Sequence, residues 1–220
     1  MSLAAQVAHL FRRELMLEQR QKYAFQGILL YVISTIFICK FSFREIQAVP
    51  SWNALFWIIL LFAAVNAVAK SFVQENRGRL LYLYTLCDPR ALLLAKMLYN
   101  ALLMFFLAMT GLGIYLLLVG NPVQDYGQFL LVTFLGSLGF ATVFTMISAI
   151  ASKAGNNFTL MAILGFPVML PLLITVIRAS KNAIDGLDWS VSWKFHLAIA
   201  VLNVLVVALS YLLFPYLWRD

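Results

Sequence analysis

Charged residues are scarce in this chain, and their scarcity excludes a soluble domain. Only 11% of the 220 residues are charged, whereas 63% are hydrophobic. Several apolar runs of about 20 residues are long enough to cross the hydrocarbon core of a bilayer. A segment surrounded by lipid must satisfy its own backbone hydrogen bonds, and a helix does so. The composition therefore predicts an all-α integral membrane protein.

Cysteine and histidine are also rare, which limits metal and redox chemistry. Cys39 and Cys87 are the two cysteines, without a C-x-x-C motif, and the expected spans place them on opposite sides of the membrane. The two histidines, His9 and His196, are separated in the same way and cannot form a His-Glu-x-x-His zinc motif. We expect this chain to bind no metal and no cofactor directly.

Catalytic motifs are missing too. No lysine follows a glycine, so the chain has no G-x-x-x-x-G-K-[ST] phosphate loop and no ATPase activity of its own. The sequence Gly136-Ser137-Leu138-Gly139 could pass for a nucleophile motif, but its span offers no histidine, lysine or acid as a base. Ser137, Ala141 and Thr145 instead repeat every four residues, as small residues do where helices pack closely. We predict a non-catalytic subunit.

Charge within the spans is almost absent, which disfavours a transporter with its own proton or ion relay. Asn66, Asn100 and Asn203 are the notable polar residues at depth. Hydrogen bonds between helices are the simplest explanation for them, and lining a path is the alternative. Without an ATPase or a relay, the chain must take its energy from a partner.

The apolar runs predict six spans in one membrane domain, residues 1–220. The expected spans are Tyr23–Cys39, Trp52–Ala69, Leu92–Val119, Tyr126–Ala151, Phe158–Ile177 and Phe195–Leu217. An interfacial helix is expected over residues 1–22 and an outer polar loop over residues 178–194. Residues 70–96 are expected to form a cytoplasmic coupling loop with a short amphipathic helix, which ends at Asp88-Pro89 because proline cannot continue it.

Basic residues decide the orientation of these spans. Six spans place both termini on one side, and that side, with the 70–96 loop, carries eleven Lys and Arg residues against five on the other. Short basic loops remain in the cytosol, so both termini are expected there. The same rule explains the net charge of +7, and no binding of nucleic acid is expected.

Two acidic residues interrupt the apolar face of the N-terminal helix. Glu14 and Glu18 fall one turn apart on that face, and Glu18 can pair with Lys22 one turn later. The simpler interpretation is a solvated helix edge. In the alternative, Glu14 holds this helix against another cytosolic element.

Two prolines lie four residues apart inside the fifth predicted span. Pro167 and Pro171 each remove one backbone hydrogen bond, so this span is expected to kink or unwind near its middle. The pair serves either as a packing kink or as a hinge.

The residues around these prolines resemble a known family. The runs Ser152–Gly155 and Ile163–Ile174 are similar to the Lys-x-Gly and L-x-L-P-x-x-x-P-L-L-I pattern of haem exporter protein B, the CcmB-type permease of cytochrome c maturation. Phe11–Leu15 resembles the family's opening F-R-x-E-L. The resemblance covers about Leu10 to Phe214. One departure is Asn76-Arg77, which follows Glu75 where the family often carries several acidic residues.

This resemblance implies an ABC-2-like permease subunit of the bacterial cytoplasmic (inner) membrane. Such a subunit works with a CcmA-type ATPase that binds ATP, a CcmC-type haem-handling membrane protein and a haem chaperone. A homodimer embedded in membrane lipid is expected, with haem as a candidate substrate. The alternatives are a membrane scaffold that transports nothing and an ABC permease for another substrate.

The candidate functional residues follow from this assignment. Those expected to dock the ATPase are Glu14, Glu75, Arg77, Gly78, Arg79 and Asp88. Pro167 and Pro171 are the candidate hinge. Trp189, Trp193 and His196 are candidates for contact with an outer partner or with haem, although His196 is expected to be an interfacial residue rather than a haem ligand.

Overall fold

The computed structural model describes residues 2–20, 22–42, 48–68, 71–72, 87–153 and 158–219. Within these residues the chain forms seven helices and no strand. They are α1 (Leu3–Arg20), α2 (Lys22–Ser42), α3 (Val49–Val68), α5 (Pro89–Val119), α6 (Tyr126–Lys153), α7 (Phe158–Ile184) and α8 (Trp189–Arg219). All but α1 are long and apolar enough to cross a membrane. The prediction of an all-α membrane protein with six spans is confirmed.

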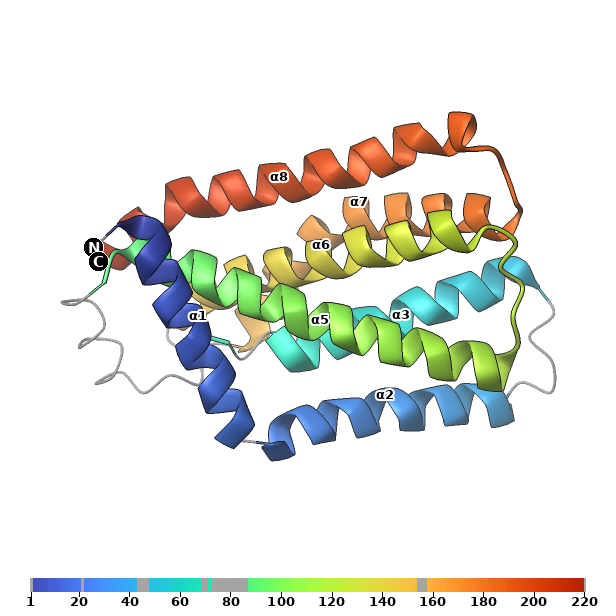
Figure 1. Cartoon of the computed structure of the whole chain (residues 1–220), viewed down its shortest axis with the longest axis horizontal. Coiled ribbons are helices and arrows are strands. Elements are labelled where there is room, and N and C mark those ends of the chain that lie inside the picture. The colour runs from blue at the N-terminus through green and yellow to red at the C-terminus, as the bar shows by residue number, and fades with distance from the viewer. Residues whose placement is uncertain are drawn as a thin grey trace.

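The six long helices run side by side, and α1 crosses one end of the bundle (Figure 1). The N- and C-termini lie together at that end, which we call the terminal end; the other is the opposite end. The expectation that both termini share one side is confirmed.

Helix α6 forms the centre of the bundle, because most of its residues are buried against α3, α5, α7 and α8. Two glycines allow this close packing. A Cβ atom at Gly136 would lie 2.8 Å from the ring of Trp57, and one at Gly139 would lie 2.6 Å from Asn203 Oδ1. Glycine at these positions lets α3 and α8 approach α6 without a clash.

Polar side chains join the spans at depth. Asn100 donates to Thr145 Oγ1 at 2.8 Å, and Asn203 donates to the carbonyl of Leu135 at 3.0 Å, so both bond across helices as expected. The same expectation is wrong for Asn66, whose amide bonds the carbonyl of Phe62 in its own helix. Asn66 is exposed, and an exposed side chain has no neighbouring helix to reach.

The outer loop predicted over residues 178–194 is wrong. Helix α7 continues to Ile184 and α8 begins at Trp189, so only residues 185–188 connect them. Gly186 has a φ of +69°, and the N–H of Leu187 bonds the carbonyl of Asn182, which together end α7 in a Schellman motif. Polar residues such as Arg178 and Lys181 lie on the exposed face of the helix rather than in a loop.

Helix α7 passes through both of its prolines without a break, so of the expected kink or unwinding near its middle, the unwinding does not occur. Pro167 and Pro171 are exposed on the surface of the bundle. A proline ring on an exposed face removes one hydrogen bond but meets no neighbouring helix, and the remaining bonds keep the helix intact.

Candidate functional site

A cluster of polar groups lies at the terminal end, beside the residues that follow α3 and the start of α5. We call this cluster the loop anchor. Its members come from α1, the end of α3, α5 and α6: Glu14, Ser71, Phe72, Lys96, Asn100, Thr145 and Ser148.

The loop anchor fixes the first two residues that follow α3 in the described chain. Lys96 Nζ donates to the carbonyl of Ser71 at 2.9 Å, and Asn100 Nδ2 donates to the hydroxyl of Ser71 at 3.1 Å. The N–H of Phe72 donates to Ser148 Oγ at 3.1 Å. Because backbone as well as side-chain groups are held, this segment cannot shift without breaking bonds to α5 and α6.

Lys96 is the charged residue at the centre of the loop anchor. Its side chain is only 2% exposed, and Nζ lies 3.5 Å from Glu14 Oε1, whose side chain is 11% exposed. The ammonium group also lies 5.1 Å from the centroid of the Phe72 ring. A buried charge is costly unless it is paired and hydrogen-bonded, and Lys96 has both kinds of partner. The pair therefore binds α1 to α5 in one defined position.

Helix α1 is also attached to the residue that precedes α5. Gln6 Oε1 accepts a hydrogen bond from the N–H of Asp88 at 3.0 Å. Between these two attachments, Leu10 packs into an apolar cluster with Leu92, Phe72 and Phe214. Helix α1 thus bonds Asp88 at the start of α5 and shares an apolar cluster with Phe72, which follows α3.

Asp88 has a structural role that the sequence had only partly indicated. Its carboxylate accepts a hydrogen bond from the N–H of Arg90 at 2.9 Å, and Pro89 occupies the first turn of α5. Aspartate at this position satisfies one of the free N–H groups of a helix start. Asp88 is therefore the N-cap of α5, and its docking role stays a prediction.

The other docking residues divide between the described and the undescribed chain. Glu14 lies in the loop anchor, so the simpler interpretation of a solvated helix edge is wrong for it. The cause is Lys96 on α5, whose ammonium group pairs with the Glu14 carboxylate and shields it from water. Glu75, Arg77, Gly78 and Arg79 lie outside the described residues.

Sequence reasoning missed Lys96 and Ser71, and it predicted Asn100 only as a residue that bonds between helices. A signal was present, because Lys96 lies four residues inside the third predicted span and Asn100 lies one turn further. A charged residue inside a span marks a functional or structural site by default. Only the fold, however, brings Ser71 and Glu14 to it.

The candidate outer residues lie at the opposite end, near the start of α8. Trp189 and Trp193 are about half exposed, whereas His196 is 8% exposed and stacks on Trp189 with ring centroids 5.7 Å apart. The structure thus joins His196 and Trp189. Trp193 takes no part in this stack.

A hydrogen-bonded turn supports this end of α8. The carboxylate of Asp125 accepts from the N–H of Gln128 at 3.0 Å and from its side-chain amide at 2.8 Å, and that amide also donates to the carbonyl of Leu187. Both bonds lower the pKa of Asp125, and the bond from the backbone N–H of Gln128 has the larger effect. In the part of the chain that the structure describes, no three His, Cys, Asp or Glu side chains gather as metal ligands.

Comparison with known proteins gives one family. A family model described as "CcmB protein" matches residues 5–212, which is nearly the whole chain. No curated protein matches the chain.

Proposed function

This chain belongs to the CcmB protein family, whose members are membrane components of haem export for cytochrome c maturation, and from this premise we propose that it couples ATP hydrolysis by a separate CcmA-type ATPase to movement of its spans. The 70–96 loop and α1 receive the ATPase. The loop anchor then passes the movement to α5 and α6.

The observation that carries this proposal is that the described residues on either side of residues 73–86 are bonded to α1, α5 and α6. Ser71 and Phe72 are held by Lys96, Asn100 and Ser148, and Asp88 is held by Gln6. A segment without fixed contacts at its ends would move with a bound partner and leave the spans in place. A segment whose ends are bonded to three helices transmits the movement of the partner, because packed helices respond by shifting as units.

The wider assembly belongs to the same proposal. The chain lies in the bacterial inner membrane with both termini in the cytosol, where the basic residues at the terminal end favour that orientation. It works as a homodimer with the ATPase, a CcmC-type haem-handling protein and a haem chaperone, and coupling serves release of the haem-loaded chaperone. ATP binds to the partner, this chain holds no cofactor, and haem is cargo.

Variants of the loop and of the loop anchor test the coupling role. Arg77→Glu, Gly78→Pro and Glu14→Gln are compared with Arg12→Gln, an exposed change on the same helix as Glu14. We expect the first three to lower the yield of holo-cytochrome c at least tenfold, while the chain still reaches the membrane and Arg12→Gln has no effect.

Co-purification with the ATPase separates docking from transmission. Arg77→Glu and Gly78→Pro are expected to lose the ATPase, whereas Glu14→Gln is expected to retain it and fail to couple. Normal holo-cytochrome c from all three variants would contradict the proposal and favour a scaffold that moves nothing.

A further inference from the structure

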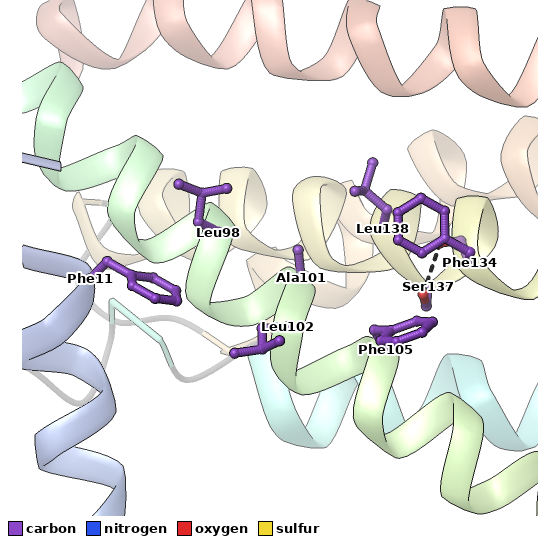
Figure 2. Close-up of a pocket in the computed structure, with 8 residues that line it drawn as sticks. All are labelled: Phe11, Leu98, Ala101, Leu102, Phe105, Phe134, Ser137 and Leu138. Carbon is purple, nitrogen blue, oxygen red and sulfur yellow. Dashed lines mark hydrogen bonds between the residues drawn. The ribbon is translucent and has the colours of Figure 1, made fainter. Parts of the chain in front are cut away.

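An apolar pocket opens on the surface of the bundle beneath α1. Its volume is about 420 Å³, within the range of roughly 300–1,000 Å³ found for small-molecule sites. The residues that line it are Phe11, Leu98, Ala101, Leu102, Phe105, Phe134, Ser137 and Leu138. Figure 2 shows Phe11 reaching from α1 toward Leu98 and Leu102, with the other side chains further along α5 and α6.

The chemistry of this pocket selects a hydrocarbon occupant. Ser137 is its one polar side chain, and its hydroxyl already donates to the carbonyl of Phe134 at 2.9 Å. The other seven lining residues are apolar, so the pocket favours a hydrocarbon chain over a polar or charged ligand. Leu98 and Leu102 are about half exposed on helix α5, which crosses the membrane, so the pocket faces lipid.

A cation lies in line with the pocket on the same helix face. Arg90 precedes Leu94 and Leu98 at four-residue spacing, and residues that far apart share one face of a helix. Its guanidinium lies 4.8 Å from the ring centroid of Tyr211 on α8, at the terminal end.

The spacing along α5 matches one leaflet of a bilayer. Fifteen residues separate Arg90 from Phe105, which is about 22 Å at a rise of 1.5 Å per residue. Half of a bilayer, headgroups included, measures about 20–22 Å. Arg90 therefore lies at headgroup depth when the pocket lies at the depth of the acyl chains.

We propose that this surface is a binding site for one anionic phospholipid, with an acyl chain in the pocket between α1, α5 and α6 and its phosphate group at Arg90. Arginine binds phosphate oxygens through charge-assisted hydrogen bonds. Such a lipid touches α1 through Phe11, so it also holds the helix that carries Glu14. The site needs only the membrane position of these helices and stands apart from the ATPase.

Native mass spectrometry of the purified, delipidated full chain tests the site. Phosphatidylglycerol and phosphatidylcholine with identical dioleoyl chains are titrated separately. We expect one phosphatidylglycerol per chain, bound about tenfold more tightly than phosphatidylcholine. Arg90→Gln is expected to remove this preference, and Arg90→Lys to keep most of it.

A pocket-filling variant tests the acyl-chain part. Leu98→Trp is expected to weaken both lipids at least tenfold, and Leu117→Trp serves as its control because Leu117 lies on the same helix and is 86% exposed. Unchanged gel-filtration profiles verify folding of each variant. Equal binding of the two lipids by the wild type, or no effect of Leu98→Trp, would overturn the site. If Leu98→Trp loses the dimer rather than the lipid, the pocket belongs to an interface with a second copy of the chain. If haem displaces the lipid, the pocket binds an apolar cargo. Either result overturns the proposal.

Discussion

Lys96 has an unusual position for a lysine, since it lies within a membrane-spanning helix and is almost fully buried. Its partners are a carboxylate on α1 and a backbone carbonyl after α3. Removing one member of a buried ion pair costs more than removing both, because the remaining charge loses a close partner while it stays largely buried. This asymmetry allows a direct measurement of how strongly α1 is held to the bundle.

We predict that Lys96→Met and Glu14→Gln each destabilise the chain by roughly 1–3 kcal/mol, because each removes one member of a largely buried ion pair. Arg13 Nη1, which lies 3.7 Å from Glu14 Oε1, remains as a second partner of that carboxylate. The double variant should lose less than the sum of the two, by at least about 1 kcal/mol, since it removes both charges. Reversible unfolding in detergent micelles measures all three. Strictly additive losses would contradict a direct interaction between Lys96 and Glu14.

Asp88 allows a test that separates capping from docking. Asp88→Ala is predicted to cost about 1 kcal/mol, because α5 loses its N-cap. Asp88→Asn keeps an acceptor for the N–H of Arg90 and removes the negative charge, so it should retain both stability and holo-cytochrome c. If Asp88→Asn is stable but fails to support maturation, the charge itself contacts a partner.

Among the elements, α1 differs most from the expectation of a helix that only lies on the membrane. Its apolar residues pack on α5, Gln6 bonds the N–H of Asp88, and Glu14 pairs with Lys96 on α5. Membrane affinity alone requires one apolar face and no such fixed polar contacts. Helix α1 is therefore a structural part of the bundle.

Helix α7 carries the predicted hinge. We predict that the Pro167→Ala/Pro171→Ala variant unfolds at a higher temperature, because two backbone hydrogen bonds are restored. We also predict that holo-cytochrome c falls, because a continuously bonded helix resists movement at this point. Thermal unfolding and cytochrome yield measure the two effects. Pro215→Ala, which removes the proline inside α8, is the matched control.

The prolines are not a hinge if the double variant gains stability and supports full maturation. In that case they set only the static shape of α7. A loss of maturation that Pro215→Ala reproduces would point to a general effect of rigidity in the spans.

At the scale of the whole molecule, the bundle places both termini at one end and the 185–188 turn at the other. With Cys39 and Cys87 replaced by serine, a cysteine introduced at Leu187 should react with a membrane-impermeant maleimide in intact spheroplasts. A cysteine at Ser2 should react only after lysis, because the basic residues retain that side in the cytosol. The reverse pattern would invert the orientation.

The sequence by itself determined the properties that depend on local composition. Six runs of apolar residues predicted six spans, because a helix in lipid requires nothing beyond length and hydrophobicity. The missing glycine-lysine motif predicted a partner for ATP hydrolysis. The Pro167–Pro171 pattern indicated the family that the match over residues 5–212 then showed. The loop predicted over residues 178–194 was wrong because its polar residues lie on the exposed faces of two helices. In a linear sequence, such residues look the same as the polar residues of a loop.

The tertiary structure alone decided which residues act together. Ser71, Lys96 and Glu14 lie far apart in the chain and meet only after α1, α3 and α5 pack. A hydrophobic pattern indicates which residues leave water, but it does not specify the rotation of each helix or its partner across the bundle. For that reason the sequence predicted a loop that receives a partner, and the fold supplied the buried ion pair that holds its base.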